Sequence, residues 1–431
     1  MKFGVAKELI TPIFKTKVAC CGKAELDFET IHDDVYTRCI IFDDGEKKAV
    51  TMSFDLLFHD RSLNNALKDY AFRKYGIEKD AFCVSYTHAH TAPAVKGYNP
   101  GHHTDAYEEF LISRGKNCID KAMASMFEGT LHYGRDDIDL NISRRGINKE
   151  GRYDNIPNFD YEHDTELFIL SIKDTKNVTK AILVNFACHP VFYPAFQTIS
   201  GEFPARLCQR LETMYRDSMA VFFQSAGGDV RPRPTVTKKE DGSYGWQYMT
   251  FADIDAFAES LSNEVSRLLN SDNMKQSGEL SIGADEFALP LEMERKPLEL
   301  FEKEWERYKG RGESAPITNA RLIANGGYAD LEDSMDLYCQ IIKLTPEFLI
   351  ATVGGEPCYG IKKAVCQALS GYDTCFIGYT DACAYIADDK VLQEGGYEAE
   401  CHVEYGLVGP FKQGINEKLK DGFKKSLNRI L

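Results

Sequence analysis

Strand-like and helix-like segments alternate along the whole length of the chain. Runs rich in β-branched and aromatic residues predict strands at 36–43, 48–54, 81–87, 166–173, 180–188, 219–224, 347–353 and 373–379. Amphipathic runs predict helices at 61–76, 106–127, 203–216, 251–270, 356–370 and 416–431. Such alternation is typical of an α/β fold with a mixed β-sheet core flanked by helices.

The sequence also indicates a single domain. No internal repeat and no low-complexity linker interrupts the 431 residues, so we expect a single domain over 1–431. Residues 228–250 are predicted to form an excursion loop, and the charged, mostly helical stretch 290–330 a peripheral cap.

Composition excludes several classes of function. A formal net charge of −15 argues against nucleic acid as the main partner. No apolar run is long enough to span a bilayer, and the first residues lack the pattern of a secretory signal, so we expect a cytoplasmic protein. The 13 cysteines include no C-x-x-C pair, which favours reduced thiols over a disulfide framework.

Polar residues with catalytic chemistry follow five of the predicted strands. Ligand crevices in open α/β sheets lie beyond the carboxyl ends of strands, so residues from distant positions can meet there. We therefore expect one shared site formed by five groups: His88 and His90, His189, Ser225 to Asp229, Glu356, and Asp381 with Tyr385.

This set predicts a metal site. His88 and His90 are two residues apart and would face the same side of an extended strand. One of this pair as ligand and the other as its neighbour, together with His189 and Glu356, gives the two imidazoles and one carboxylate typical of catalytic zinc, which activates a water molecule. The alternative for His189 is a strand end stiffened by Pro190, and for Glu356 a turn leading into a helix N-terminus. The spacing matches no short zinc motif, so both interpretations stay open.

Five segments together resemble one enzyme family. They are THAHTAP at 87–93, NFACHP at 185–190, QSAGGDVRP at 224–232, GGE at 354–356 and YIADDKVLQEGGYEAE at 385–400. In this order they resemble the catalytic domain of the neutral (alkaline, non-lysosomal) ceramidases, and 4–14, 31–44 and 141–146 fit the same pattern. The resemblance covers nearly the whole chain. It implies a zinc amidohydrolase that cleaves the N-acyl bond of ceramide.

The resemblance also implies residue roles. The zinc ligands would be His88, His189, Glu356 and Tyr385. His90 would be the acid/base group beside the metal. Arg144, with Arg145 as the competing alignment, and Tyr397 would donate hydrogen bonds to the developing oxyanion.

The sequence departs from the family at the serine of its Gly-Asp-x-Ser-Pro-Asn segment. Arg231 stands at that place, and Ser225 lies nearby but does not match it. Arginine stays protonated and cannot replace a nucleophile. Arg231, with Arg233, instead suggests a site for an anionic substrate group, and the alternative is that these arginines pair with acidic residues. The family's ceramidases also carry a C-terminal immunoglobulin-like domain, and we expect this chain to correspond to the catalytic domain alone.

The remaining polar residues receive minor roles. Asp229 and Asp381 are predicted to orient the metal ligands, and His102 and His103 to lie in a loop. The expected function is zinc-dependent hydrolysis of an amide or ester bond in a small acylated substrate, anionic or sugar-linked. Three alternatives stay open: a true ceramidase, a metal-dependent carbohydrate lyase or isomerase, and a non-catalytic metal-binding relative.

Overall fold

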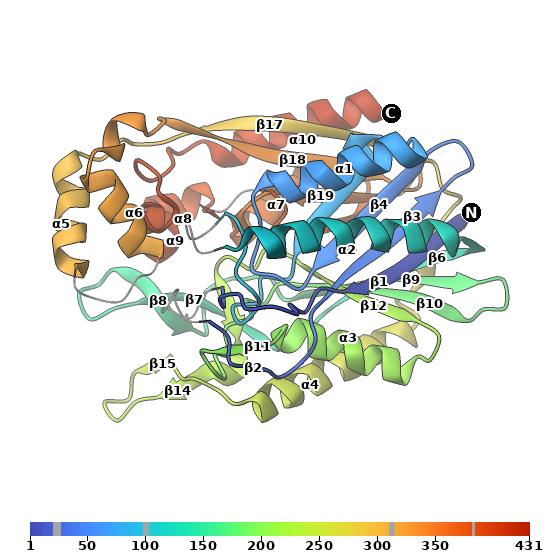
Figure 1. The fold of residues 1–431 in the computed structure, drawn as a ribbon, viewed down its shortest axis with the longest axis horizontal. Coiled ribbons are helices and arrows are strands. Elements are labelled where there is room, and N and C mark those ends of the chain that lie inside the picture. Colours follow the sequence, from blue (N-terminus) through green and yellow to red (C-terminus); the bar gives the residue numbers. More distant parts are fainter. Residues whose placement is uncertain (20–26, 98–102, 310–314, 382–383) are drawn as a thin grey trace.

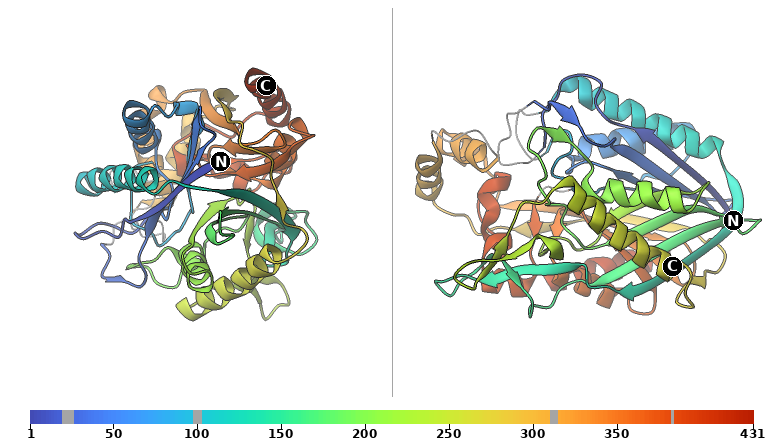
Figure 2. Two further views of the ribbon diagram at one scale, coloured as in Figure 1. Left: turned by 90° about the vertical axis from the view of Figure 1, so that its right-hand side faces the viewer. Right: turned by 90° about the horizontal axis from the view of Figure 1, so that it is seen from below.

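The structure is a computed structural model that describes residues 1–19, 27–97, 103–309, 315–381 and 384–431. Two β-sheets pack face to face, and helices cover their outer faces (Figure 1; Figure 2). The expected mixed α/β fold is confirmed. Within the described residues, no helix has the length and apolar character to cross a membrane.

The larger sheet has the order β12-β10-β9-β6-β1-β3-β4-β5, with short β16 pairing to β6. The pairs β10/β12 and β4/β5 are parallel, and the other pairs are antiparallel. The strands are β1 (Lys2–Leu9), β3 (Tyr36–Asp43), β4 (Lys48–Phe54), β5 (Phe82–Tyr86), β6 (Phe127–Asp137), β9 (Glu166–Asp174), β10 (Thr179–Phe186), β12 (Met219–Gln224) and β16 (Lys275–Gln276).

The second sheet has the order β17-β18-β19-β21, with bounds Gly283–Glu292, Ser334–Lys343, Phe348–Val353 and Asp373–Ile377. Its last pair, β19/β21, is parallel. Fully buried side chains of both sheets, such as Phe42, Leu170 and Ile350, share one apolar cluster between the layers. Because β19 and β21 are buried on both faces, they read in the sequence as continuous apolar runs.

Helices surround the two packed sheets. The bounds are α1 (Arg61–Tyr75), α2 (Asp105–Ala124), α3 (Glu202–Met214), α4 (Phe251–Leu269), α5 (Leu298–Tyr308), α6 (Ala315–Ala324), α7 (Tyr359–Ala368), α8 (Asp389–Glu394), α9 (Tyr397–Glu400) and α10 (Ile415–Ile430). Helices α1 and α2 pack on the β3-β4-β5 side, α3 and α4 on β9, β10 and β12, and α7 and α10 on the second sheet (Figure 2). Local signals set the ends of α1, where Asp60 accepts from Ser62 N and Gly76 takes a left-handed conformation.

The predicted cap at 290–330 is helical in part. Helices α5 and α6 pack together and contact the turn Cys401–Tyr405 at one end of the molecule (Figure 1). Residues 283–292 belong instead to β17. The boundaries of the single predicted domain stay a prediction.

The prediction of a loop at 228–250 is wrong in part. Strand β13 (Val230–Pro232) adds to β7 (Asn141–Ile147), which pairs with β8 (Tyr153–Asn158). The segment then forms a hairpin of β14 (Val236–Lys238) and β15 (Tyr244–Trp246). These three-residue strands arise from pairing with distant segments, and no local period in the sequence marks them.

Candidate metal centre

Three histidines from two strand ends converge in the protein interior. His88 and His90 follow β5, and His189 follows β10. The Nε2 atom of His189 lies 3.1 Å from Nε2 of His88 and 3.1 Å from Nε2 of His90. All three side chains are buried, and their ligand atoms lie within 4.8 Å of one another. This group is able to hold a metal ion.

Backbone carbonyls fix the orientation of two of these rings. Nδ1 of His88 lies 3.0 Å from the Leu57 carbonyl oxygen, and Nδ1 of His189 lies 3.1 Å from that of Gly227. A carbonyl only accepts, so Nδ1 carries the proton in both rings, and each neutral imidazole presents its Nε2 lone pair to the centre. Two lone pairs at this distance repel unless a cation lies between them. Such an orientation is the usual support for a metal-binding histidine.

Glu356 brings a carboxylate to the same point. Its Oε1 accepts from the Tyr405 hydroxyl at 2.7 Å, and its Oε2 lies 3.1 Å from His88 Nε2 and 3.8 Å from His189 Nε2. This Oε2 atom is buried and, within the described residues, makes no hydrogen bond. Ligands of a tetrahedral zinc ion are about 3.3 Å apart, given bonds of about 2.0 Å. The Nε2 atoms of His88 and His189 and the Oε2 atom of Glu356 therefore have the spacing and donor types that zinc prefers.

Electrostatics favour neutral imidazole and ionised carboxylate. Burial, and then His88, hold the pKa of His189 well below its ordinary value. Burial raises the pKa of Glu356, but the neighbouring His88 and Tyr405 outweigh it, so that the net shift is downward. Both shifts favour the protonation states that bind a metal ion.

The segments behind the ligands are tightly turned. His88 has a φ of 65° and Gly355 a φ of 69°, both in the left-handed region. A Cβ at Gly355 would overlap the Ala384 carbonyl oxygen. This close approach lets the two-residue strands β20 (Glu356–Pro357) and β22 (Tyr385–Ile386) pair in parallel, which places Glu356 beside Tyr385.

Tyr385, the fourth expected ligand, lies next to the centre. Its ring stacks on that of His189 with centroids 6.4 Å apart, and it packs edge-on against Tyr397 and Tyr405. Burial raises the pKa of Tyr385 well above its ordinary value, and the nearby Arg144 opposes that shift. The phenol is therefore placed at the site as a neutral group.

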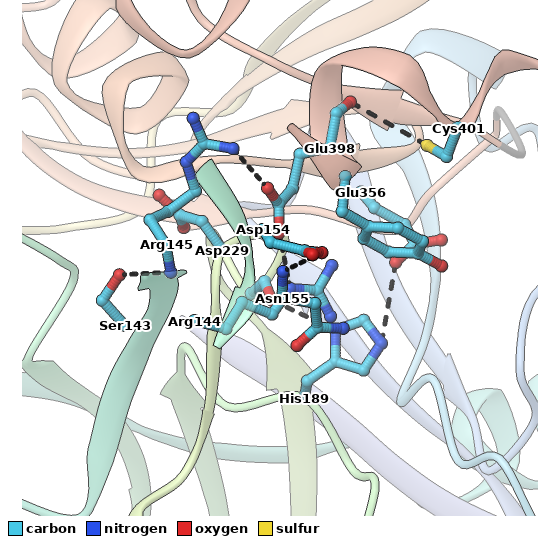
Figure 3. A network of polar contacts seen from close by, with 12 residues as sticks. Ser143, Arg144, Arg145, Asp154, Asn155, His189, Asp229, Glu356, Glu398 and Cys401 are labelled. Atoms are coloured by element: carbon cyan, nitrogen blue, oxygen red, sulfur yellow. Dashed lines mark hydrogen bonds and ion pairs between the residues drawn. The ribbon is translucent and has the colours of Figure 1, made fainter. Parts of the chain in front are cut away.

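The structure shows which of the two neighbouring residues, Arg144 or Arg145, faces the candidate metal centre. Both pair with Glu398, Arg144 through Nε and Arg145 through a terminal nitrogen, each at 2.7 Å (Figure 3). The Arg144 guanidinium lies over the Tyr385 and Tyr397 rings, at 4.9 and 5.3 Å, whereas Arg145 is bound by the Gly395 carbonyl and stacks on a different ring. Arg144 is thus the arginine that the fold brings to the centre.

The other expected catalytic groups also lie nearby. The hydroxyl of Tyr193 lies 3.3 Å from His90 Nδ1. The Tyr397 hydroxyl donates to Glu404 at 2.9 Å. Burial raises the pKa of Glu404 to about 7, although this hydrogen bond opposes the shift. His90 and Tyr397 therefore both contact polar partners around the centre.

The two aspartates do not contact the histidines in the expected way. Asp229 accepts from the Tyr359 backbone at the start of α7, and its own carbonyl accepts from Arg144 N. Asp381 pairs with Arg61 and accepts from Asn64. Asp229 thus positions Arg144, and Asp381 ties α1 to the loop after β21.

Ser225 and the flanking polar groups belong to separate networks. The Ser225 hydroxyl donates to Asp164, which also binds Lys362, in a buried ion-pair cluster. His103 lies 3.7 Å from Asp105, and His102 lies outside the described residues. None of these contacts involves the three histidines.

Arg231 and Arg233 differ sharply. Arg233 forms an ion pair with Asp139, which fits the alternative of pairing with acidic residues. Arg231 is buried, donates to the Val191 carbonyl at 3.3 Å and stacks on Trp246 at 4.4 Å. Within the described residues, no carboxylate lies within ion-pair distance of Arg231.

Sequence reasoning missed several residues that shape the centre. Glu202, buried at the start of α3 with a φ of 50°, accepts from Phe192 N. Tyr405 holds Glu356, and Glu398 holds both arginines. The sequence marked these residues only by their position in or near the motifs that resemble the ceramidase family. Their roles could not be assigned from the sequence, because they depend on contacts between distant segments of the fold.

Comparisons with known proteins define the fold. No family model matches the chain, and no curated protein does. A solved structure of neutral ceramidase from Pseudomonas aeruginosa matches with a TM-score of 0.74 at 16% identity, over 99% of this chain and 73% of that one. A ceramidase complexed with C2 matches with a TM-score of 0.73 at 15% identity, over 100% and 75%.

The fold and the site together define a class of protein. In this class of α/β proteins, buried imidazoles that are able to hold a metal ion lie beyond the ends of several strands. Within it, this chain has the fold of neutral ceramidase over its whole length, so the structural resemblance expected from the sequence motifs is confirmed.

Proposed function

We propose that the protein is a zinc-dependent hydrolase that cleaves an amide or ester bond of a small acylated substrate. One observation carries this proposal. Two imidazoles with fixed tautomers converge at a buried point of a ceramidase-like fold with one carboxylate oxygen that has no hydrogen bond to any described residue. This donor set suits a divalent ion with room for a reacting molecule.

His88, His189 and Glu356 would hold the ion, with Tyr385 beside them as a fourth donor. Zinc bound there supplies Lewis acidity, which makes water nucleophilic near neutral pH and polarises a carbonyl group. Leu57 O, Gly227 O and the Tyr405 hydroxyl keep the donor atoms aimed at the centre. The protein thus contributes a preorganised site.

Proton transfer and charge stabilisation fall to neighbouring side chains. We assign His90 as the group that moves the proton between the nucleophile and the leaving group, because its Nε2 lies at the centre and its Nδ1 faces the Tyr193 hydroxyl. One terminal nitrogen of Arg144 is buried and, within the described residues, makes no hydrogen bond. We assign this nitrogen to the negative oxygen that develops during carbonyl attack. Tyr397 joins it when protonated Glu404, whose pKa burial raises to about 7, donates to the Tyr397 hydroxyl and so frees the tyrosine proton for that oxygen.

The second candidate is hydrolysis of ceramide. It is favoured by the likeness in fold to a neutral ceramidase and to a ceramidase complexed with C2. Against it stands Arg231 at the place of the family's serine. We therefore rank a soluble acyl compound first.

Metal analysis and a substrate panel test the proposal together. Elemental analysis should find about one zinc per wild-type chain and much less in Glu356→Gln or His189→Ala. The control is Glu347→Gln, which alters a surface carboxylate that accepts from Gly278 N and should keep the metal. A panel of N-acyl amino acids, O-acetyl sugars and short-chain ceramide, with zinc added, should then show turnover that Glu356→Gln loses.

Two results decide against the proposal. Wild-type protein that binds no divalent ion would end the assignment of the centre. Turnover of any panel member that persists in Glu356→Gln would place the reaction elsewhere. Turnover of ceramide alone would favour the second candidate.

A further inference from the structure

Arg231 is a buried cation with no ion-pair partner among the described residues, and Glu202 acts on it only from beyond ion-pair distance. Its side chain is 8% exposed, its polar contact is the Val191 carbonyl, and its Nε atom makes no hydrogen bond within the described residues. Burial lowers the pKa of Arg231 to about 10, so the group remains charged at neutral pH. Burying an unpaired charge is costly, and stacking on Trp246 offsets only part of that cost.

Other deeply buried arginines in the described chain are paired. Arg38 pairs with Asp55 at 2.6 Å, and Arg144 and Arg145 share Glu398. The chain carries 66 acidic residues and a net charge of −15, so carboxylates are plentiful. The lack of one beside Arg231 therefore points to an anion that comes from outside the chain.

The strand register places Arg231 at the candidate metal centre. In the β13/β7 pair Arg231 lies opposite Ile142, and Arg144, two residues further along β7, faces the same side. Diagonal neighbours of this kind have Cβ atoms about 7 Å apart. Val191, whose carbonyl holds the Arg231 guanidinium, is two residues beyond His189. An anion at Arg231 would thus lie on the same face of the strand pair as a carbonyl group at Arg144.

An aromatic wall continues from His90 toward solvent. Tyr193 packs edge-on against His90 at 5.5 Å, and Tyr248, which is 72% exposed, packs edge-on against Tyr193 and Phe196 at 5.8 Å. Such rings offer apolar area to a hydrocarbon group. The surroundings of the histidines therefore include both a buried cation and an apolar aromatic surface.

We propose that Arg231 binds a carboxylate of the substrate and that the substrates are N-acyl amino acids, with the acyl group against Tyr193 and the amino-acid carboxylate at Arg231. This inference rests on the proposed hydrolase function and names its substrate class. The planar guanidinium fork matches a carboxylate, and in an N-acyl amino acid only two atoms separate the scissile carbonyl carbon from the carboxylate carbon.

The test compares N-hexanoylglycine with N-hexanoylglycinamide, which has the same internal amide bond but no charge. Calorimetric binding to metal-free and zinc-loaded wild type, and kcat/KM of the loaded protein, are measured for both compounds. We expect the acid to bind at least about tenfold more tightly, since hydrogen bonds to charged groups contribute about 1.5–3 kcal/mol. Arg231→Gln should abolish this preference, and Arg231→Lys should retain part of it.

Arg233→Gln is the matched control, because it removes a nearby arginine that is already paired with Asp139. It should keep the preference for the acid. Equal binding of acid and amide by wild type, or a preference that survives in Arg231→Gln, would overturn the inference. The wild-type comparison decides even where the variant does not fold. A wild type that binds the acid preferentially but hydrolyses neither compound would overturn N-acyl amino acids as the substrate class, whereas the hydrolase function itself fails only if no member of the wider panel is turned over.

Discussion

Adjacent arginines on one strand have different tasks because they face opposite sides of it. Arg144 lies over Tyr385 and Tyr397 and keeps one terminal nitrogen that makes no hydrogen bond in the part of the chain that the structure describes. Arg145 is fully buried on the other side, where Glu398 and Glu394 bind it. Both arginines pair with the carboxylate of Glu398, but their other contacts differ. Arg144 is therefore expected to act in turnover and Arg145 in stability.

Lysine at each position should separate these effects. Arg144→Lys keeps the charge but loses the planar fork, and we expect kcat to fall by about 10²-fold, as when a donor to a developing oxyanion is removed. Arg145→Lys should leave kcat within a few-fold of wild type and lower the melting temperature, since it breaks a buried ion-pair network. Steady-state kinetics and thermal unfolding of both variants measure this. A larger loss of kcat in Arg145→Lys would reverse the assignment.

At the scale of residues, the sequence identified the groups whose chemistry is rare. His88, His189 and Glu356 follow predicted strands, and the structure brings them together. It did not identify Tyr405 or Glu202, because tyrosines and glutamates occur throughout the chain and only the folded geometry singles these two out. It also did not distinguish Arg144 from Arg145, since the face of β7 depends on its pairing with β13.

At the scale of elements, the centre depends on two very short strands. β20 and β22 are two residues long, pair in parallel and set Glu356 beside Tyr385. The mostly buried strands, such as β4, β12 and β19, were predictable because they form mostly apolar runs of five or more residues, whereas the long but partly exposed β6, β17 and β18 were not predicted. Strands as short as β13, β20 and β22 have no such pattern, so their pairing is set by the tertiary fold. The turn at Gly355 is what allows β20 to approach β22.

Alanine at Gly355 tests this turn. The substitution adds backbone strain at a φ of 69° and a clash with the Ala384 carbonyl, so we expect displacement of Glu356 and loss of most bound metal. Gly76→Ala is the matched control, since Gly76 has a φ of 66° but nothing within 4 Å of its added Cβ. The control should lower stability by about 1–2 kcal/mol and keep the metal. Elemental analysis and denaturant unfolding distinguish these outcomes, and metal retained in Gly355→Ala would refute the role of the turn.

A buried histidine ties α2 to the loop that carries Leu57. His59 lies 2.5 Å from Glu108 of α2 and 3.0 Å from Asp60. Burial lowers the pKa of His59, but these two carboxylates outweigh it and raise the pKa from 6.5 to about 9. The interaction of protonated His59 with the two carboxylates therefore contributes its full stabilisation of the fold below pH 6.5. This stabilisation is lost as the pH rises through 9, where His59 loses its proton in the folded state.

His59→Gln should consequently cost the most stability near pH 6, on the order of 3 kcal/mol, and little above pH 10. Urea unfolding of wild type and variant across this range measures the difference. His132→Gln serves as control, because burial lowers the pKa of His132 and no such loss with rising pH is expected there. A His59→Gln effect that does not change with pH would show that packing, and not charge, accounts for the cost.

At the scale of the whole molecule, the candidate ligands connect distant parts of the chain. His88 follows β5 and His189 follows β10, both of the larger sheet, and Glu356 follows β19 of the second sheet. A metal ion bound by all three would therefore link the two layers of the sandwich. Since such a site does not exist in the unfolded chain, the binding free energy adds to the free energy of unfolding.

Removal of the metal should then destabilise the whole protein. At a free zinc concentration 1,000 times the dissociation constant, the stabilisation is about 4 kcal/mol, which in a chain of this size corresponds to a shift of several degrees in melting temperature. We expect a chelator to lower the wild-type melting temperature by that amount and added zinc to restore it. In Glu356→Gln the carboxylate that belongs to the second sheet is lost, so chelator and zinc should change the melting temperature little. A chelator effect of equal size in both proteins would mean that the stabilising ion binds elsewhere and that the two sheets are held together without it.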